Sequence, residues 1–283
     1  MMKRVERVSL YVDPFSPPYG GLVQSLLRTC ADCGLDLTVS TASASAFEDR
    51  DLEEGDECDV ALVVGGDGTI LRGIDHFRRL GVPVLGVNTG HLGFLASVES
   101  EETLPALRKL SKGEYTEHDM TLLSGTMPSG QKLTAVNDLC INRSMMGGIL
   151  HLEMMVEEEL IARVAGDGVV VATPTGSTAY ALSAGGPILD PDLPAMLVVP
   201  IAPHQLSLRP VVLPHSVRVR LKIGKIRGSG PFVSADGTPV GSLKAGEELA
   251  VTTTSDYCKV VRLDNWGGYY GRLGQKLGWG ARG

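Results

Sequence analysis

Hydrophobic and polar positions alternate in long blocks along the first part of the chain. Apolar runs that predict strands are found at 5–12, 35–41, 58–64 and 82–88. Segments whose apolar residues recur every three or four positions predict helices at 20–34, 68–81 and 100–113. This succession of apolar strands and helices predicts a parallel sheet with helices on both faces.

The pattern changes after Gly113, where helical spacing largely stops. Short alternating or apolar runs between turn residues then predict strands at 115–127, 132–143, 150–164, 211–223, 231–240 and 247–263. A further apolar strand runs into a helix start at 177–183, and 269–280 predicts a short closing helix. We therefore expect an α/β domain over residues 1–116 and a mostly β domain over 117–265.

Composition narrows the classes of partner. The chain has 43% hydrophobic and 21% charged residues and a net charge of −7, which is the profile of a globular protein without a basic face for nucleic acid. No apolar run approaches the roughly 18 residues of a spanning helix, and the first residues lack the apolar core of a signal peptide. We expect a cytoplasmic protein with no nucleic-acid and no membrane partner. The five cysteines form no second pair, so no residue is assigned as a metal ligand.

Two predicted strands end in unusual loops, at 65–69 (GGDGT) and 88–94 (NTGHLGF). The carboxyl ends of parallel strands border one crevice, where ligands of such sheets bind. Glycines let backbone N–H groups approach phosphate oxygens, and a helix start near Thr69 adds a positive dipole end. Arg72 is a candidate anion ligand. Asp67 is then either a turn former or a carboxylate with a chemical role.

Two later stretches carry unusual polar residues. An apolar strand leads into TPTGST at 173–178, and four hydroxyl residues exceed what a helix cap needs. Hydroxyl and N–H groups at a helix start suit a polar ligand. Asn137 and Asp138 interrupt another apolar strand, where unsatisfied polar groups are costly. This pair is either a turn or bulge, or a site that recognises a ribose diol.

These stretches together resemble NAD kinases over nearly the full length of the chain. The matching pieces are GGDGT (65–69), NTGHLGF (88–94), ND (137–138), DGVVVATPTGSTAYALSAGGPI (167–188) and PHQLSLRPVVLP (203–214). GGDGT is shared with diacylglycerol and sphingosine kinases, whereas the TPTGSTAY segment is far more specific. The order and spacing of all five pieces fit the NAD kinase family.

The resemblance implies a fold and a reaction. It implies an α/β domain with a parallel sheet, a C-terminal β-sandwich-like domain, and a segment 266–283 that packs back on the first domain. The reaction transfers the terminal phosphoryl group of ATP, or of polyphosphate, to the 2′-hydroxyl of the adenosine ribose of NAD, with Mg²⁺. It also implies a homodimer or homotetramer.

The resemblance also implies roles for residues of this chain. Asp67 is the expected general base, and Asn137 and Asp138 are expected to hold the adenosine ribose. The other residues expected to bind nucleotide fall into four sets: Gly66, Gly68, Thr69 and Arg72 at the donor phosphates; Phe94, Thr178 and Ala179 at adenine; Asp167, Tyr180 and Ser183 at the nicotinamide half; and Thr175, Ala181, Leu182 and Ala202 elsewhere along the nucleotide. Thr238 stands where many relatives have Gln, so that one family contact is not carried over.

Two other functions remain open at this point. A lipid kinase uses the same GGDGT turn, but it needs an apolar cleft for acyl chains and has no need of TPTGSTAY. A dinucleotide sensor without catalysis binds the same ligand, but it has no need of Asp67.

Overall fold

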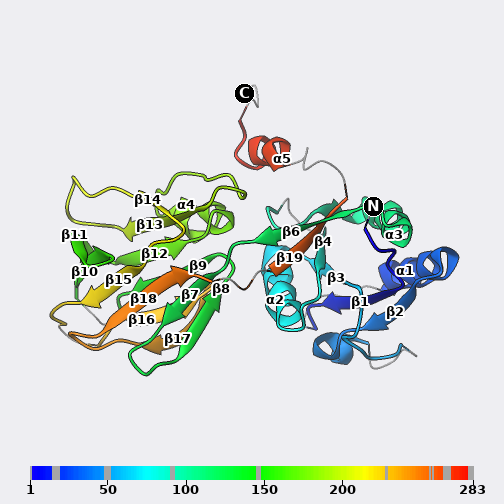
Figure 1. Cartoon of the computed structure of the whole chain (residues 1–283), viewed down its shortest axis with the longest axis horizontal. Helices are drawn as coiled ribbons and strands as arrows, with labels where there is room; N and C mark the ends of the chain where they lie inside the picture. The colour runs from blue at the N-terminus through cyan, green and yellow to red at the C-terminus, as the bar shows by residue number, and fades with distance from the viewer. Residues whose placement is uncertain are drawn as a thin grey trace. The chain divides into compact units, whose positions relative to one another are not determined.

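The computed structural model describes residues 2–14, 20–47, 52–89, 93–144, 148–226, 229–254, 256, 258–263 and 269–279. It divides the chain into two compact units (Figure 1). Unit 1 consists of Met1–Asp119 and Cys258–Gly283, and unit 2 of Met120–Tyr257. Each unit has its own sheet system and its own apolar core.

Unit 1 is built on a seven-stranded sheet in the order β2-β1-β3-β4-β19-β6, with β5 paired to β4. The strands are β1 (Arg7–Val12), β2 (Asp36–Val39), β3 (Val60–Gly65), β4 (Val84–Asn88), β5 (Val98–Glu99), β6 (Thr116–Met120) and β19 (Cys258–Arg262). Strand β1 is parallel to β2 and β3, and β4 is parallel to β3, β5 and β19. The predicted parallel sheet is confirmed.

Helices cover both faces of this sheet. Successive residues of a strand point to opposite faces, so each apolar strand has side chains to bury on both. Besides the short 3₁₀ helices, the helices of unit 1 are α1 (Gly20–Cys33), α2 (Asp67–Arg78), α3 (Thr103–Lys112) and α5 (Tyr269–Lys276). Leu10 and Leu62 share one core with Leu26 of α1 and Leu107 of α3. Helix α2 packs on the other face, so closely that a Cβ added at Gly73 would lie 2.6 Å from the Val63 side chain.

Strand β19 departs from the expected domain limits. The predicted β domain runs to residue 265, but Val260 pairs in parallel with Val84 of the first sheet. The run 247–263 therefore divides into β18 (Glu248–Thr253) of unit 2 and β19 of unit 1. Parallel pairing with a strand so distant in sequence leaves no local pattern, so hydrophobic periodicity cannot assign a strand to its sheet.

Unit 2 consists of two six-stranded sheets whose neighbouring strands are antiparallel, in the orders β11-β10-β15-β18-β7-β8 and β14-β13-β12-β9-β16-β17. The first sheet contains β7 (Leu123–Thr126), β8 (Lys132–Ala135), β10 (Leu150–Val156), β11 (Glu159–Gly166), β15 (Val219–Ile223) and β18. The second contains β9 (Asp138–Asn142), β12 (Gly168–Ala172), β13 (Ala195–Ile201), β14 (Val211–Pro214), β16 (Phe232–Ala235) and β17 (Thr238–Ser242). The two sheets share one core, so the predicted sandwich is confirmed.

The second sheet is also covered on its outer face. Val170 and Val199 form a smaller core there with Ala181 and Leu189, from the segment that follows β12. This segment contains the 3₁₀ helix Thr175–Thr178 and the single-turn helix α4 (Tyr180–Ser183). Strand β12 is therefore buried on both faces, which explains its unbroken apolar sequence. In the described part of the chain, no helix is long and apolar enough to span a membrane.

Candidate active site

The order of strands in unit 1 changes direction at β1. Strand β2 lies on one side of β1 and β3 on the other, and open α/β sheets bind ligands where the order reverses in this way. Asp13 follows β1, whereas Gly66 and Asp67 follow β3. Arg72 of α2 donates to the Asp13 carboxylate at 2.5 Å and so links the two loops.

The Asp67 carboxylate is fixed by the loop that follows β4. Asp67 is the first residue of α2, and its oxygens accept hydrogen bonds from the backbone N–H groups of Phe94, at 3.0 Å, and Leu95, at 3.1 Å. A Cβ added at Gly93 would lie 2.1 Å from Asp67 Oδ1, so only glycine permits this approach. The two predicted loops do meet. Residues 90–92 of the second loop lie outside the described residues.

The glycine turn leaves the start of α2 open. Gly65 is fixed by packing, since its Cβ would lie 2.6 Å from Thr69 Cβ. A Cβ at Gly66 would meet nothing within 4 Å, and one at Gly68 would meet only the end of the Arg72 side chain, at 3.8 Å. Gly66 caps α2 without a side-chain hydrogen bond. The exposed backbone at Gly66 and Gly68 therefore leaves room for an anion at the start of the helix.

In unit 2, Asp236 organises the Asn137–Asp138 pair. The Asp236 carboxylate accepts hydrogen bonds from the backbone N–H groups of Val136 at 2.8 Å, Asn137 at 2.7 Å and Asp138 at 3.1 Å. Its own N–H donates to the Asp138 carbonyl at 2.9 Å. Asp236 sits in the β16–β17 turn with a φ of 48°, a backbone conformation that is uncommon outside glycine. The backbone N–H groups of Asn137 and Asp138 are therefore both hydrogen-bonded where β9 begins.

The TPTGST segment folds onto the same pair. Thr173 donates through its hydroxyl to the Val136 carbonyl at 2.7 Å and through its N–H to the Asn137 carbonyl at 2.9 Å. Gly176 donates to the Thr173 hydroxyl at 2.9 Å, and a Cβ added at Gly176 would lie 2.0 Å from the Asn137 carbonyl oxygen. Glycine is required at Gly176 because the two backbones touch.

Asp138 is a buried carboxyl, with 5% of its surface exposed. Burial, together with the neighbouring charge of Asp236, raises the pKa of Asp138 to about 7. Partial burial and the nearby carboxylates of Asp138 and Asp167 also raise the pKa of Tyr180. A carboxyl group in this state can accept or donate a hydrogen bond to a ribose hydroxyl near neutral pH.

The remaining predicted residues of unit 2 lie in different surroundings. Asp167 and Ala202 lie beyond the opposite end of β12 from Thr173, a separation of about 20 Å at 3.3 Å per residue. There Asp167 pairs with Arg143 at 2.5 Å, and Ala202 has a φ of 42°. The other five divide by exposure: Tyr180 and Ser183 are exposed, Thr175 and Leu182 are half-buried, and the Ala181 methyl group is buried in the outer core.

In unit 1, the described residues of the predicted site form one cluster around Asp67: Gly66, Gly68, Thr69, Arg72 and Phe94. In unit 2, Asn137 and Asp138 form a second cluster with the Thr173–Thr178 turn. Thr178 donates to the Thr175 carbonyl at 3.1 Å, and Ala179 links that turn to α4.

Sequence reasoning assigned no role to three residues that build these clusters. Gly93 makes room for the Asp67 carboxylate, and Asp236 holds the Asn137–Asp138 backbone. Lys276 of α5 places its Nζ 3.6 Å from Asp67 Oδ2. The Asp-Gly turn at 236–237 is a readable signal. A single lysine in a closing helix gives no such signal in the sequence.

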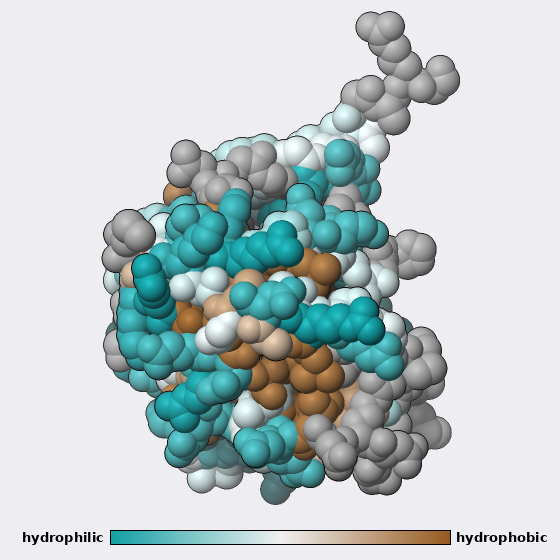
Figure 2. Space-filling model, turned by 90° about the vertical axis from the view of Figure 1, so that its right-hand side faces the viewer, coloured by the Kyte–Doolittle hydropathy of each residue, from teal (hydrophilic) through white to brown (hydrophobic). Residues whose placement is uncertain are grey.

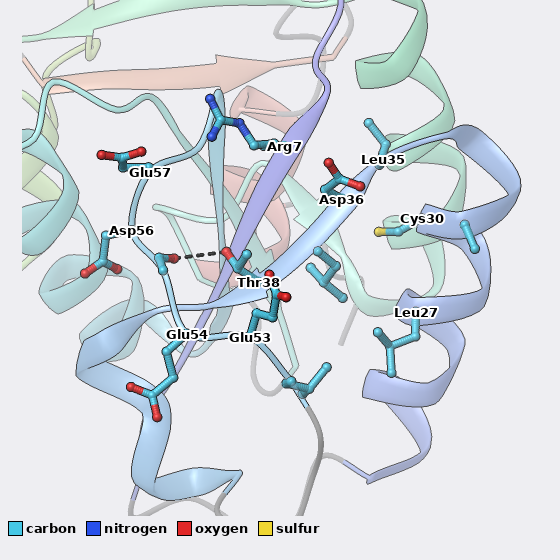
Figure 3. A pocket seen from close by; sticks show the side chains of 14 residues that line it. Arg7, Leu27, Cys30, Leu35, Asp36, Thr38, Glu53, Glu54, Asp56 and Glu57 are labelled. Carbon is cyan, nitrogen blue, oxygen red and sulfur yellow. Dashed lines mark hydrogen bonds between the residues drawn. The ribbon is translucent and has the colours of Figure 1, made fainter.

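A cavity of about 770 Å³ in unit 1 is a poor candidate for the same role. Figure 3 shows that Asp36, Glu53, Glu54, Asp56 and Glu57 surround it, while Thr38 donates to the Gly55 carbonyl at 3.0 Å. These carboxylates repel nucleotide phosphates. Figure 2 shows a hydrophobic patch on the face of unit 1 where α1 and β2 lie. The lining of the cavity includes no residue of the Asp67 cluster.

No cluster of three or more His, Cys, Asp or Glu side chains suited to a metal ion occurs among the described residues. Magnesium in kinases is commonly held by one or two carboxylates together with the substrate's phosphates.

The fold is similar to that of solved kinases. A yeast NADH kinase complexed with NADH matches at a TM-score of 0.87 and 27% identity, covering 99% of this chain and 90% of that one. An NAD kinase from Archaeoglobus fulgidus in complex with ATP shares the fold, at a TM-score of 0.76 and 23% identity, covering 97% of this chain and 100% of that one. Fold and glycine turn together define a two-domain kinase.

Sequence comparisons narrow this class. The N-terminal domain of ATP-NAD kinases matches residues 20–115, and the C-terminal domain matches residues 136–263. The NAD kinase of Methylibium petroleiphilum is 35% identical over 99% of this chain and 96% of its own length. The chain belongs to the NAD kinase family, and the predicted family is confirmed.

Proposed function

We propose that this chain transfers the terminal phosphoryl group of ATP to the 2′-hydroxyl of the adenosine ribose of NAD, forming NADP. The observation that carries this proposal is the Asp67 carboxylate, held by two backbone N–H groups at the open start of α2. A fixed carboxylate beside a phosphate-binding turn is what transfer to a hydroxyl group requires.

In the proposed reaction, Asp67 accepts the proton of the ribose hydroxyl. The ribose oxygen forms a new bond to the terminal phosphorus atom as the bond from phosphorus to the bridging oxygen breaks, and ADP leaves. The N–H groups at Gly66 and Gly68 bind donor phosphates, and Mg²⁺ supplies charge neutralisation when bound. A correctly positioned general base accelerates such reactions by about 10²–10⁴-fold, and we expect a rate contribution of this size from Asp67.

We assign recognition of the adenosine ribose to Asn137 and Asp138. Their backbone is fixed by Asp236 and by Thr173, so the two side chains are pre-organised. Two adjacent polar side chains suit a ribose diol, whose hydroxyls each donate and accept. The other nucleotide-binding residues named from the sequence remain part of the proposal, as do a homodimeric or homotetrameric state and a cytoplasmic location.

A matrix of donors and acceptors tests the proposal. The protein is incubated with Mg²⁺ and either ATP or polyphosphate, and with NAD, NADH, diacylglycerol or sphingosine. Nucleotide products are separated by chromatography, and lipid products by extraction. We expect NADP from ATP and NAD, with no phosphorylated lipid. The absence of NADP with every donor would refute the proposal, whereas NADP from polyphosphate alone would correct only the donor. Light scattering of the same preparation gives the oligomeric state.

A further inference from the structure

The C-terminal helix α5 has no role assigned by the family match. The two matched domains end at residues 115 and 263, whereas α5 spans Tyr269–Lys276. The helix belongs to unit 1, the unit that contains Asp67.

One face of α5 is directed toward the rest of unit 1. Tyr269 and Leu273 are buried, whereas Tyr270 is 66% exposed. Residues three, four and seven positions apart share one face of a helix, so Arg272 and Lys276 lie on the same side as the two buried residues. The inner face of α5 therefore combines two apolar anchors with two basic side chains.

Lys276 meets an acidic group at the carboxyl end of the sheet, and the charge of Arg272 is favoured by acidic groups there. Lys276 Nζ lies 3.6 Å from Asp67 Oδ2 and 4.0 Å from the centre of the Phe94 ring. Burial lowers the pKa of Arg272, while the charges of Glu99, Asp67 and Glu102 favour its charged form. Arg272 is thus suited to anchor α5, and Lys276 brings a positive charge to Asp67.

Phosphoryl transfer at Asp67 brings two negatively charged groups together, and the positive charge of Lys276 can offset their repulsion. The incoming phosphoryl group and the Asp67 carboxylate are both negative and repel each other. The start of α2 offers about half a positive charge, which Asp67 already offsets as the first helical residue. The Lys276 ammonium group has three donors, and its 3.6 Å contact with Asp67 is longer than a hydrogen bond. Its donors can therefore turn to phosphoryl oxygens beside the carboxylate.

We propose that Lys276 is a catalytic residue of the phosphoryl transfer, whose ammonium group binds oxygens of the phosphoryl group as it moves. Tyr269, Arg272 and Leu273 hold α5 in the required position. The inference rests on the proposed NAD kinase reaction. Lys276 remains protonated throughout: the hydroxyl proton goes to Asp67, and the bond between phosphorus and the leaving oxygen breaks as the new one forms.

The test compares Lys276→Met, Lys276→Arg and Lys276→Ala with the wild type, using ATP, Mg²⁺ and NAD. The matched control is Lys259→Met, which removes another lysine of unit 1, one that pairs with Glu117 at 2.7 Å. We expect Lys276→Met to lower kcat by about 10²–10³-fold, as the loss of one preorganised donor does elsewhere. Lys276→Arg keeps the charge and retains most of kcat. Ethylammonium should restore part of the activity of Lys276→Ala, and the control should match the wild type.

Three further readouts separate a catalytic role from a structural one. The Kd for NAD, measured by calorimetry, and the Tm should stay unchanged in Lys276→Met. Near wild-type kcat in Lys276→Met would overturn the inference. So would equal losses in all three variants with a lower Tm and no rescue, because these indicate a structural role. A wild-type protein without NAD kinase activity would overturn the proposed function first, before any variant is compared.

Discussion

Asp138→Asn is expected to make the protein more stable, and by an amount that grows with pH. Asp138 has a carboxyl whose pKa is raised to about 7 by burial and by Asp236, against 3.8 in the absence of these effects. The folded state therefore binds the proton more tightly than the unfolded state. Stability from this group is fully present below pH 3.8 and is lost as pH rises to about 7. Asparagine has a similar shape but cannot ionise, so it avoids the loss.

The size of the effect follows from the two pKa values. Each pKa unit between the unfolded and folded values is worth 1.36 kcal/mol. Measurements at pH 5 and pH 8 cover about two of these roughly three pKa units, because the stability stops changing with pH above the folded pKa of about 7. The gain in unfolding free energy from Asp138→Asn should therefore be about 2–3 kcal/mol larger at pH 8 than at pH 5.

Urea denaturation followed by circular dichroism measures the gain at both pH values. The matched control is Glu159→Gln, which removes an exposed carboxylate of the same unit and should give a similar small change at pH 5 and pH 8. An Asp138→Asn gain that is equal at the two pH values, or larger at pH 5, would show that the carboxyl is not desolvated as described.

Three further substitutions test the contacts that build the two clusters. Gly93→Ala should lower kcat by at least tenfold and destabilise the protein by about 1–3 kcal/mol, because the new methyl group overlaps the Asp67 carboxylate; steady-state kinetics and urea denaturation check both. Gly176→Ala should lower the affinity for NAD, measured by calorimetry, and the Tm, because the added Cβ would meet the Asn137 carbonyl; a variant with wild-type affinity contradicts this prediction. Asp236→Ala should cost about 2–4 kcal/mol in urea denaturation, since it leaves three backbone N–H groups without their acceptor, and an unchanged midpoint refutes the role.

Much of the fold could be predicted from local patterns in the sequence. Strands β1, β3 and β4 were predicted because parallel strands buried on both faces have unbroken apolar sequences. Strand β13 has a similar apolar run, AMLVVPI, but it was not among the strands predicted within the β domain. Strand β19 was predicted as a strand and assigned to the other domain, because its parallel pairing with β4 depends on a partner far away in the sequence.

The site was predicted where its chemistry is local. The GGDGT turn combines glycine, carboxylate and helix start within five residues, so Asp67 was recognisable from its neighbours. Asp236 and Lys276 act on residues distant in the chain, and nothing in the sequence around them names those partners. Gly93 was noted as part of a glycine loop, but its reason, a 2.1 Å approach to Asp67 Oδ1, exists only in three dimensions.

The central claim is that Asp67 is the base of the phosphoryl transfer, and the kcat of Asp67→Asn tests it most directly. Asparagine preserves the shape and can still accept the N–H groups of Phe94 and Leu95, but it cannot take a proton. We predict a fall in kcat of about 10²–10⁴-fold, with NAD affinity retained and a Tm that is equal or higher. Near wild-type kcat in a folded Asp67→Asn protein would contradict the claim and leave Asp67 as a turn residue.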